Sequence, residues 1–277
     1  MLLRFIVENL FCFAGETIFS MVAGKDDAHP EHRIKTTKHN ALRTSALYGA
    51  NAHGKSRLLM AMALAKRLVV EGSKPDKKIP VKPYRLDSHL QTQPSRFEFT
   101  IFTQGIEYTY GFVVDVDRVH EEWLFSRPNK QEVCLFERVT DAALNTKITI
   151  GPSLARPGSK ERAVVEFLQL SVRKNQLFLT ECVERNFNKV KPVYDWFSKT
   201  LHIIFPNQTL LPVAHLAHKD DHFGKFVNQF LKLADTGISG IETRQDKIDA
   251  KSAFPDAPDE LRRDFERPWV VHTIKHT

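Results

Sequence analysis

Alternating apolar and polar positions mark the middle of the chain as a series of strands. In the run 96–103, Phe97, Phe99 and Ile101 alternate with polar residues, as in a strand with one buried and one wet face. Gln104-Gly105 then predicts a tight hairpin, because glycine supplies a positive φ at no steric cost. The strands expected from such patterns cover 1–8, 11–21, 96–103, 106–114, 119–126, 133–139 and 147–150. Together they predict an antiparallel β-layer.

Apolar residues at three- and four-residue spacing predict helices, mostly in the second half of the chain. These helical runs cover 57–68, 163–170, 190–200 and 223–234. In the last run Phe226, Phe230 and Leu233 share one stripe, and Gly237 is expected to end the helix. A short strand at 201–205 and a last strand at 269–274 complete the prediction, and the charged stretch 247–267 is expected to be a solvated helix or an insertion.

The change of pattern divides the chain into two predicted domains. Residues 1–155 are expected to form a strand-rich N-terminal lobe, and residues 156–277 a mainly helical subdomain. The length of 277 residues has room for one large domain or two small ones.

Cysteine usage, hydropathy and charge narrow the classes of protein. Cys12, Cys134 and Cys182 lie far apart, which argues against a disulfide framework or a zinc ribbon and suits a reducing cytoplasm. No segment approaches the roughly 20 apolar residues of a membrane span. The net charge of +7 permits contact with nucleic acid without requiring it. We therefore expect a cytoplasmic protein that makes no membrane contact.

A phosphate-binding motif is the main candidate for chemistry. The run Gly49–Ser56 fits the pattern G-x-x-x-x-G-K-[ST], the Walker A motif. Its flanks agree, since Thr44–Tyr48 is a short β-capable run and the residues after Ser56 favour a helix. Strand, glycine-rich turn and helix together favour a true phosphate site over an accidental surface turn.

Each residue type of the motif has a chemical reason. The glycines let backbone N–H groups converge on an anion, and the following helix directs the positive end of its dipole at the phosphates. Lys55 is predicted to act catalytically by contacting the β- and γ-phosphates, and the Ser56 hydroxyl to be a ligand of Mg²⁺. ATP and Mg²⁺ are thus the expected cofactors. The predicted nucleotide-binding residues are Gly49, Ala50, Asn51, Ala52, His53, Gly54, Lys55, Ser56 and Arg57.

The motif and its neighbours resemble the opening of the RecF/SMC-like ABC ATPases. Leu3-Arg4-Phe5, Glu8-Asn9-Leu10 and Phe13 precede Tyr48 and the loop in the same order. The chain is most similar to bacterial AAA family ATPases of the overcoming-lysogenization-defect (OLD) and abortive-infection type. Many members have glycine where Ala52 stands, although alanine is also familiar in this subgroup. Later similar segments are Pro83–Asp87, Phe97–Phe99, Tyr108–Phe112, Glu122–Leu124, Leu135–Arg138 and Leu233–Ile238.

This resemblance implies an α/β fold of the P-loop NTPase class: a mixed β-layer plus a core sheet, followed by a helical subdomain. It implies an ATP-hydrolysing switch subunit of an antiphage defence system that forms a homodimer or higher homo-oligomer and controls a nuclease or toxin effector. The alternatives are a RecF-like repair ATPase that binds DNA, and a nucleotide-binding scaffold without turnover.

The second half of an ATPase site is missing from the sequence pattern. After Ser56 there is no run of four apolar residues followed by Asp-Glu (the Walker B strand), and there is no ABC signature. In the resembled family these parts come later, so we expect the 277 residues to be an N-terminal lobe. Hydrolysis would then need a C-terminal half and a second protomer.

Weaker candidates surround this prediction. Phe13, Arg33 or Lys35 could contact the base, and Gln91 or Gln93 could coordinate Mg²⁺, by their order in the chain. The acids Glu121 and Glu122 could be a paired-carboxylate site but are more simply surface charges, and the strand aromatics could stack on bases but are more simply core. The four lysines of the next loop are either a solvated loop or a nucleic-acid contact: Lys74, Lys77, Lys78 and Lys82. Weak metal candidates are His215, His218 and His222 with Asp220 and Asp221, and the pair His272 and His276.

Overall fold

The computed structural model describes most of the chain as two compact units. The described residues are 1–25, 29–36, 39–129, 131–141, 143–205, 216–234, 238–246 and 269–276. The first unit is Met1–Ile203 and the second is Ile204–Thr277. The change from strands to helices near residue 155 falls inside the first unit, because the helices that follow pack on the sheet.

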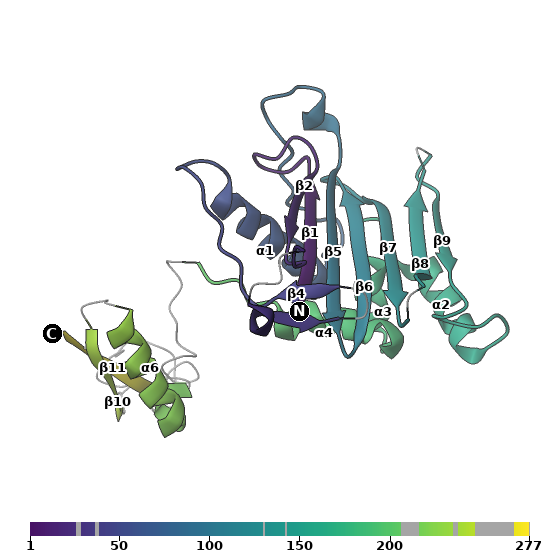
Figure 1. Ribbon diagram of the computed structural model, residues 1–277. Coiled ribbons are helices and arrows are strands. Elements are labelled where there is room, and N and C mark those ends of the chain that lie inside the picture. Colours follow the sequence, from purple (N-terminus) through teal and green to yellow (C-terminus); the bar gives the residue numbers. More distant parts are fainter. Residues whose placement is uncertain are drawn as a thin grey trace, which may run out of the picture. The chain divides into compact units, whose positions relative to one another are not determined.

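One antiparallel sheet dominates the first unit (Figure 1). Its order is β2-β1-β5-β6-β7-β8-β9, and each neighbouring pair is antiparallel. The predicted β-layer is therefore confirmed, although β2 is shorter than the expected 11–21 because Leu10 and Phe13 form a tight turn. The strands are β1 (Leu2–Glu8), β2 (Thr17–Ser20), β5 (Ser95–Thr103), β6 (Ile106–Val114), β7 (Val119–Arg127), β8 (Val133–Thr140) and β9 (Thr146–Ile150).

The predicted alternation sorts the two faces of the sheet. The side chains of Phe97, Phe99 and Ile101 are fully buried, as expected. The Phe99 ring packs against Phe5 of β1 at 4.6 Å and against Phe197 at 4.9 Å between ring centroids. The β5–β6 turn is the predicted one, since Gln104 and Gly105 have φ values of 51° and 77°.

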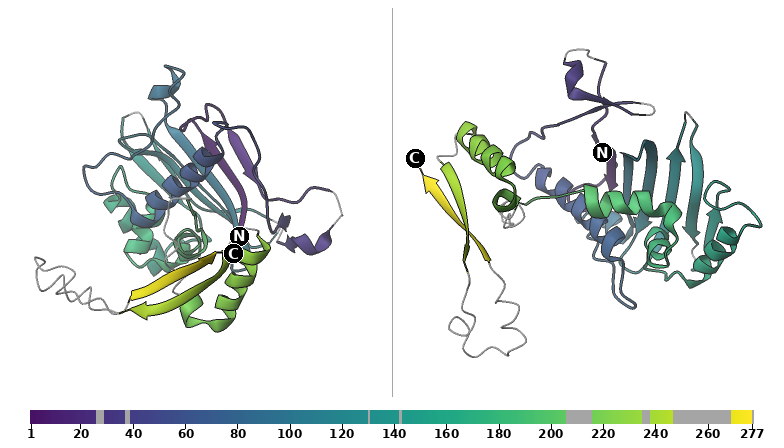
Figure 2. Two further views of the ribbon diagram at one scale, coloured as in Figure 1. Left: turned by 90° about the vertical axis from the view of Figure 1, so that its left-hand side faces the viewer. Right: turned by 90° about the horizontal axis from the view of Figure 1, so that it is seen from below.

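Helices cover one face of this sheet, as Figure 2 shows in the view from below. The predicted helical runs are confirmed, and the backbone of the run 190–200 widens into the π-helical turn η4. The strand expected at 201–205 is wrong, because the Leu201 N–H bonds back to the Trp196 carbonyl and ends that turn. The helices are α1 (Lys55–Glu71), α2 (Lys160–Ser171), α3 (Phe178–Glu184) and α4 (Lys191–Asp195), which η4 (Trp196–Thr200) continues.

In the sequence, a small β-hairpin lies between β2 and α1. Its strands β3 (Arg33–Lys35) and β4 (Asn40–Leu42) follow the 3-10 turn η1 (Pro30–His32). Main-chain hydrogen bonds join Leu42 to Met21 and Ala23 to Asn40, so the hairpin continues from the end of β2. The first of its strands is centred on Ile34, within an otherwise polar stretch of the sequence.

The second unit contains the helix α6 (Asp221–Leu233) and the antiparallel strands β10 (Ile238–Asp246) and β11 (Trp269–His276). The Asp220 side chain caps α6 by accepting hydrogen bonds from the N–H groups of His222 and Phe223. The predicted stripe of Phe226, Phe230 and Leu233 lies on α6, but all three side chains are exposed. Gly237 and the charged stretch 247–267 lie outside the described residues.

Among the described residues, no helix is both long enough and apolar enough to cross a bilayer.

We expect a pH-dependent contribution to stability from the turn between β6 and β7. Burial alone would raise the pKa of Asp115, but the hydrogen bonds from His120 and from the N–H groups of Asp117 and Arg118 outweigh it and lower this pKa. Asp115→Asn should therefore cost about 1 kcal/mol at neutral pH. Because the folded-state pKa lies below the ordinary 3.8, this cost should vanish as pH falls through it.

Denaturant unfolding of both proteins between pH 7 and pH 3 measures this difference. A cost for Asp115→Asn that stays constant down to pH 3 would contradict the assignment.

Candidate functional site

The phosphate-binding motif forms an open loop before α1. Of its predicted flanks, the helix is confirmed, but the strand at Thr44–Tyr48 is wrong: these residues pair with no strand among the described residues. Their side chains are exposed, with Tyr48 91% and Leu47 45% accessible. Without a neighbouring strand, the N–H and C=O groups of this segment have no ladder to join, which explains the difference.

The loop backbone turns through two left-handed residues. Ala52 has φ 66° and Gly54 has φ 85°. At Gly54 a Cβ atom would lie 3.1 Å from the Cys12 sulfur and 3.4 Å from the Phe13 ring, so a side chain here would crowd both neighbours in addition to straining the positive φ. Ala52 adopts its left-handed conformation despite its Cβ, so the departure from glycine at this position does not prevent the loop from closing.

Lys55 lies across this loop. Its Nζ donates hydrogen bonds to the carbonyl oxygens of Gly49 at 2.6 Å and of Ala50 at 2.7 Å. His53 folds onto the same loop, with Nδ1 3.0 Å from the Asn51 carbonyl oxygen. The lysine charge is thereby held over the backbone of the motif.

The start of α1 is suited to an anion. This 17-residue helix begins at Lys55, and its first turn contains no acidic residue. The Ser56 side chain is exposed next to Lys55, and the Arg57 guanidinium lies 5.6 Å from the centre of the Phe11 ring. Free N–H groups, the helix dipole and the lysine charge all favour negative charge at this position. The motif residues therefore fit a polyphosphate, and their individual roles toward a nucleotide stay a prediction.

Asn9 directly follows β1 and links the end of this strand to the segment 84–94 by hydrogen bonds. Its side chain is 2% exposed and donates hydrogen bonds to the carbonyls of Leu90 at 2.8 Å and Gln93 at 2.9 Å. It also accepts one from the Tyr84 N–H at 3.1 Å. In the sequence only the resemblance pointed to Asn9, because a single asparagine gives no periodic signal.

The other predicted contacts of a nucleotide are placed unequally. Phe13 lies against Gly54 of the loop, whereas Arg33 and Lys35 belong to β3. The Gln91 side chain donates to the Arg85 carbonyl at 2.8 Å, and Gln93 lies in the exposed segment that Asn9 holds. The structure thus brings Phe13, but neither glutamine side chain, to the loop by a contact that it records.

The weak metal candidates all belong to the second unit. His215 lies outside the described residues, while His222 belongs to α6 and His218 precedes it. His272 and His276 lie four residues apart in β11, opposite Thr243 and Ile238 of β10.

The strand aromatics and one of the two predicted surface acids are buried in the large sheet. The aromatic side chains Phe97, Phe99, Tyr110 and Phe112 are fully buried, so they are core and cannot stack on bases. Glu122 is also fully buried, so its interpretation as a surface acid is wrong. The alternating pattern of β7 did place it on the inner face, which was the signal available in the sequence.

Glu122 holds α3 on the sheet. Its carboxylate accepts hydrogen bonds from the N–H groups of Phe178 at 2.6 Å and Leu179 at 2.9 Å, and from the Tyr110 hydroxyl at 3.0 Å. The buried Arg138 guanidinium lies 3.9 Å away. Burial raises the pKa of Glu122, and Arg138 and the backbone donors oppose this rise. The group is structural, since donors from α3 and β6 satisfy both oxygens of this fully buried carboxylate.

The predicted basic loop lies next to two further cations that come from a distant part of the sequence. Lys77 and Lys78 line a surface hollow with Arg173 and Lys174. The Asn175 side chain fixes the loop by donating to the carbonyls of Lys74 and Lys77 at 3.0 and 2.9 Å. These charges are far apart in the sequence, so only the fold reveals that they form one patch.

Comparison with known proteins assigns the family. A family model described as "AAA domain, putative AbiEii toxin, Type IV TA system" matches residues 45–267, which include the loop, α1, the strands β5 to β9 and α2 to α4. No curated protein and no solved structure matches the chain significantly. With its α/β architecture and its motif at the start of α1, the chain belongs to this AAA-domain family of P-loop ATPases.

Proposed function

We propose that the chain binds ATP with Mg²⁺ in the loop Gly49–Ser56 and acts as a nucleotide-dependent switch in a bacterial antiphage defence system. The observation that carries the proposal is the loop itself, in which Lys55 lies over the backbone at the start of a helix whose first turn has no acidic residue. The family description, which names a toxin of a toxin–antitoxin system, supports the defence setting. The resemblance to OLD-type ATPases points the same way.

Different residues of the loop have different roles in the proposed binding of ATP and Mg²⁺. The N–H groups between Gly49 and Lys55 surround the phosphates, and Lys55 exchanges its carbonyl partners for phosphate oxygens as a charge-assisted donor. The Ser56 hydroxyl is the proposed Mg²⁺ ligand, and the ion supplies charge neutralisation between the β- and γ-phosphates when bound. Phe13 and Arg57 flank the loop and contribute to the binding surface.

Hydrolysis and signalling in this proposal need a second protein surface. Apolar side chains are exposed beside the loop, namely Leu47 and Tyr48 before it and Leu59 and Met60 on α1. Exposed apolar residues around a site support assembly with another protein surface. We propose a homodimer or higher homo-oligomer that controls a nuclease or toxin effector.

The second candidate is a repair ATPase that binds DNA. It is favoured by the cationic patch of Lys77, Lys78, Arg173 and Lys174, together with the net charge of +7. Such a patch binds phosphates in a salt-dependent way.

A phage challenge tests the proposed function. Bacteria that carry the complete defence locus should survive infection, and cells with Lys55→Ala in this chain should lose that protection. Cells with Lys82→Ala, an exposed lysine outside the loop, should keep it. If Lys55→Ala protects fully, the nucleotide switch is contradicted.

The repair candidate has a different outcome. It requires that the purified chain bind duplex DNA, and that Lys77→Glu with Lys78→Glu abolish this binding at moderate salt. DNA binding of this kind, without any phage protection by the locus, would replace the defence proposal.

A further inference from the structure

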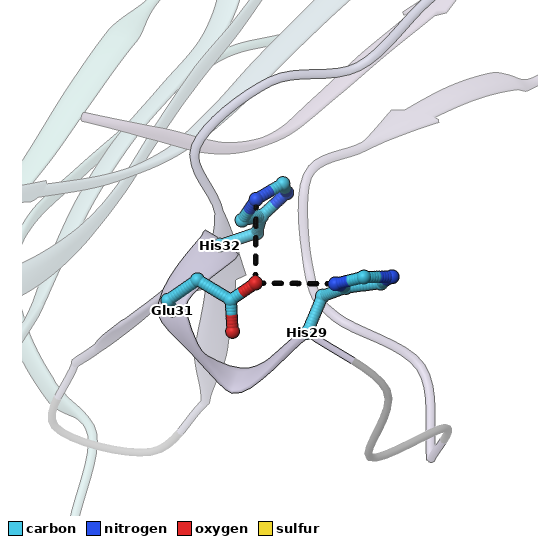
Figure 3. A group of neighbouring side chains, drawn as sticks. All are labelled: His29, Glu31 and His32. Atoms are coloured by element: carbon cyan, nitrogen blue, oxygen red, sulfur yellow. Dashed lines mark hydrogen bonds and ion pairs between the residues drawn. The ribbon is translucent and has the colours of Figure 1, made fainter.

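A compact group of metal-ligating side chains lies on the turn η1, outside the nucleotide site. It consists of His29, Glu31 and His32 (Figure 3). Each residue offers one ligand atom, and the three atoms lie within 4.8 Å of one another. Figure 3 shows both imidazole rings beside the same carboxylate. Among the described residues, this group brings three such atoms together.

The spacing of these atoms fits a tetrahedral ion. Zinc bonds to imidazole nitrogen and carboxylate oxygen are about 2.0 to 2.2 Å long, so neighbouring ligand atoms of a tetrahedron lie about 3.3 to 3.5 Å apart. In the structure, one Glu31 oxygen lies 3.1 Å from His29 Nδ1 and 3.6 Å from His32 Nε2. These two separations lie on either side of the expected edge length, and the two imidazole nitrogens lie within 4.8 Å of each other.

The local fold holds the three residues in place. Pro30 begins the 3-10 turn between them, and the His32 N–H bonds to the His29 carbonyl at 3.0 Å. Arg43, which directly follows β4, donates its main-chain N–H to the His32 carbonyl at 3.0 Å and its Nε–H to the Glu31 carbonyl at 3.0 Å. The backbone of two ligands is thus fixed, while their side chains are exposed and free to take up an ion from solvent.

We propose that His29, Glu31 and His32 form a binding site for a divalent transition-metal ion, Zn²⁺ by its ligand chemistry. Two imidazole nitrogens and one carboxylate suit Zn²⁺, whereas Mg²⁺ and Ca²⁺ prefer oxygen ligands. Three protein ligands leave one position for water. Because the turn η1 leads directly into β3, a bound ion would fix the start of the β3–β4 hairpin.

Cobalt uptake tests the site without relying on enzyme activity. The full chain, free of nucleotide because triphosphates chelate metals, is titrated with Co²⁺ and followed by its visible absorption. We expect one equivalent of tetrahedral Co²⁺, bleached by Zn²⁺ and unaffected by millimolar Mg²⁺. A proton shared between His29 and Glu31 would give similar distances, and absence of Co²⁺ uptake would show that arrangement and overturn the proposal.

Matched variants locate the ion. His29→Ala with His32→Ala should weaken Co²⁺ binding by more than about 100-fold, since even indirect support of a ligand is worth 10- to 100-fold. His218→Ala with His222→Ala removes two histidines of the other unit and should leave the spectrum unchanged. Equal uptake by the first variant, or loss of uptake in the second, would contradict the assignment. Because Lys55→Ala should also bind Co²⁺ normally, failure of this proposal is distinct from failure of the nucleotide site.

Discussion

Replacement of Lys55 by alanine should weaken the binding of ATP by about 10- to 150-fold and leave the fold intact. A hydrogen bond to a charged group contributes about 1.5 to 3 kcal/mol, and each 1.4 kcal/mol changes a dissociation constant tenfold. Lys55 is the cation whose Nζ already lies over the loop, at 2.6 Å from the Gly49 carbonyl oxygen. Its removal therefore takes away the charge that the phosphates would meet, while the glycines and the helix remain.

Titration calorimetry with a slowly hydrolysed ATP analogue measures this effect. The thermal midpoint of Lys55→Ala should equal that of the wild type, because the lost hydrogen bonds are exposed and local. Lys82→Ala provides the control for a lost surface charge and should bind like the wild type. Unchanged affinity in Lys55→Ala would remove the nucleotide from this loop.

Replacement of Glu122 by glutamine should destabilise the first unit by about 3 to 5 kcal/mol. Breaking a buried ion pair at one partner costs this much, because it leaves the other charge without compensation. Here Arg138 would remain fully buried, with its remaining hydrogen bonds to backbone carbonyls such as that of Gln176 at 2.6 Å. A neutral amide also accepts more weakly from the N–H groups of Phe178 and Leu179, so the start of α3 loosens.

Denaturant unfolding compares this variant with Glu121→Gln, the exposed neighbour on the same strand. The control should change stability by less than about 0.5 kcal/mol. If Glu122→Gln does not fold, the double variant Glu122→Leu with Arg138→Met keeps the test open: it should be more stable than either single loss of charge. A cost of Glu122→Gln no larger than that of Glu121→Gln would contradict the buried pair.

Most of the large sheet was predictable from local pattern. Phe97, Phe99 and Ile101 alternate along β5, and Gln104-Gly105 fixes the following turn, so two strands and their register follow from adjacent residues. Burial of Glu122 was harder to predict, because its partner Arg138 lies opposite it on the next strand β8 and its partner Phe178 comes from a helix far along the chain. The charge of Glu122 alone does not indicate which residues will surround its carboxylate.

The candidate site was also predictable only where its structure depends on neighbouring residues. The motif from Gly49 to Ser56 fixes the loop and the start of α1, because its chemistry depends on neighbouring residues. The strand at Thr44–Tyr48 could not be predicted reliably, since an apolar run forms a strand only where another strand pairs with it. The approach of Cys12 and Phe13 to Gly54, and the meeting of His29 with His32 around Glu31, depend on turns that no periodicity marks.

The central claim is that the loop binds a nucleotide by its terminal phosphates. The most direct test is a calorimetric titration of the wild-type chain with ATP analogue, ADP and AMP in excess Mg²⁺. We predict one site per chain that binds the ATP analogue and ADP, and binds AMP far more weakly, because Lys55 and the loop N–H groups contact the β- and γ-phosphates. No saturable binding, or equal affinity for AMP, would contradict the account.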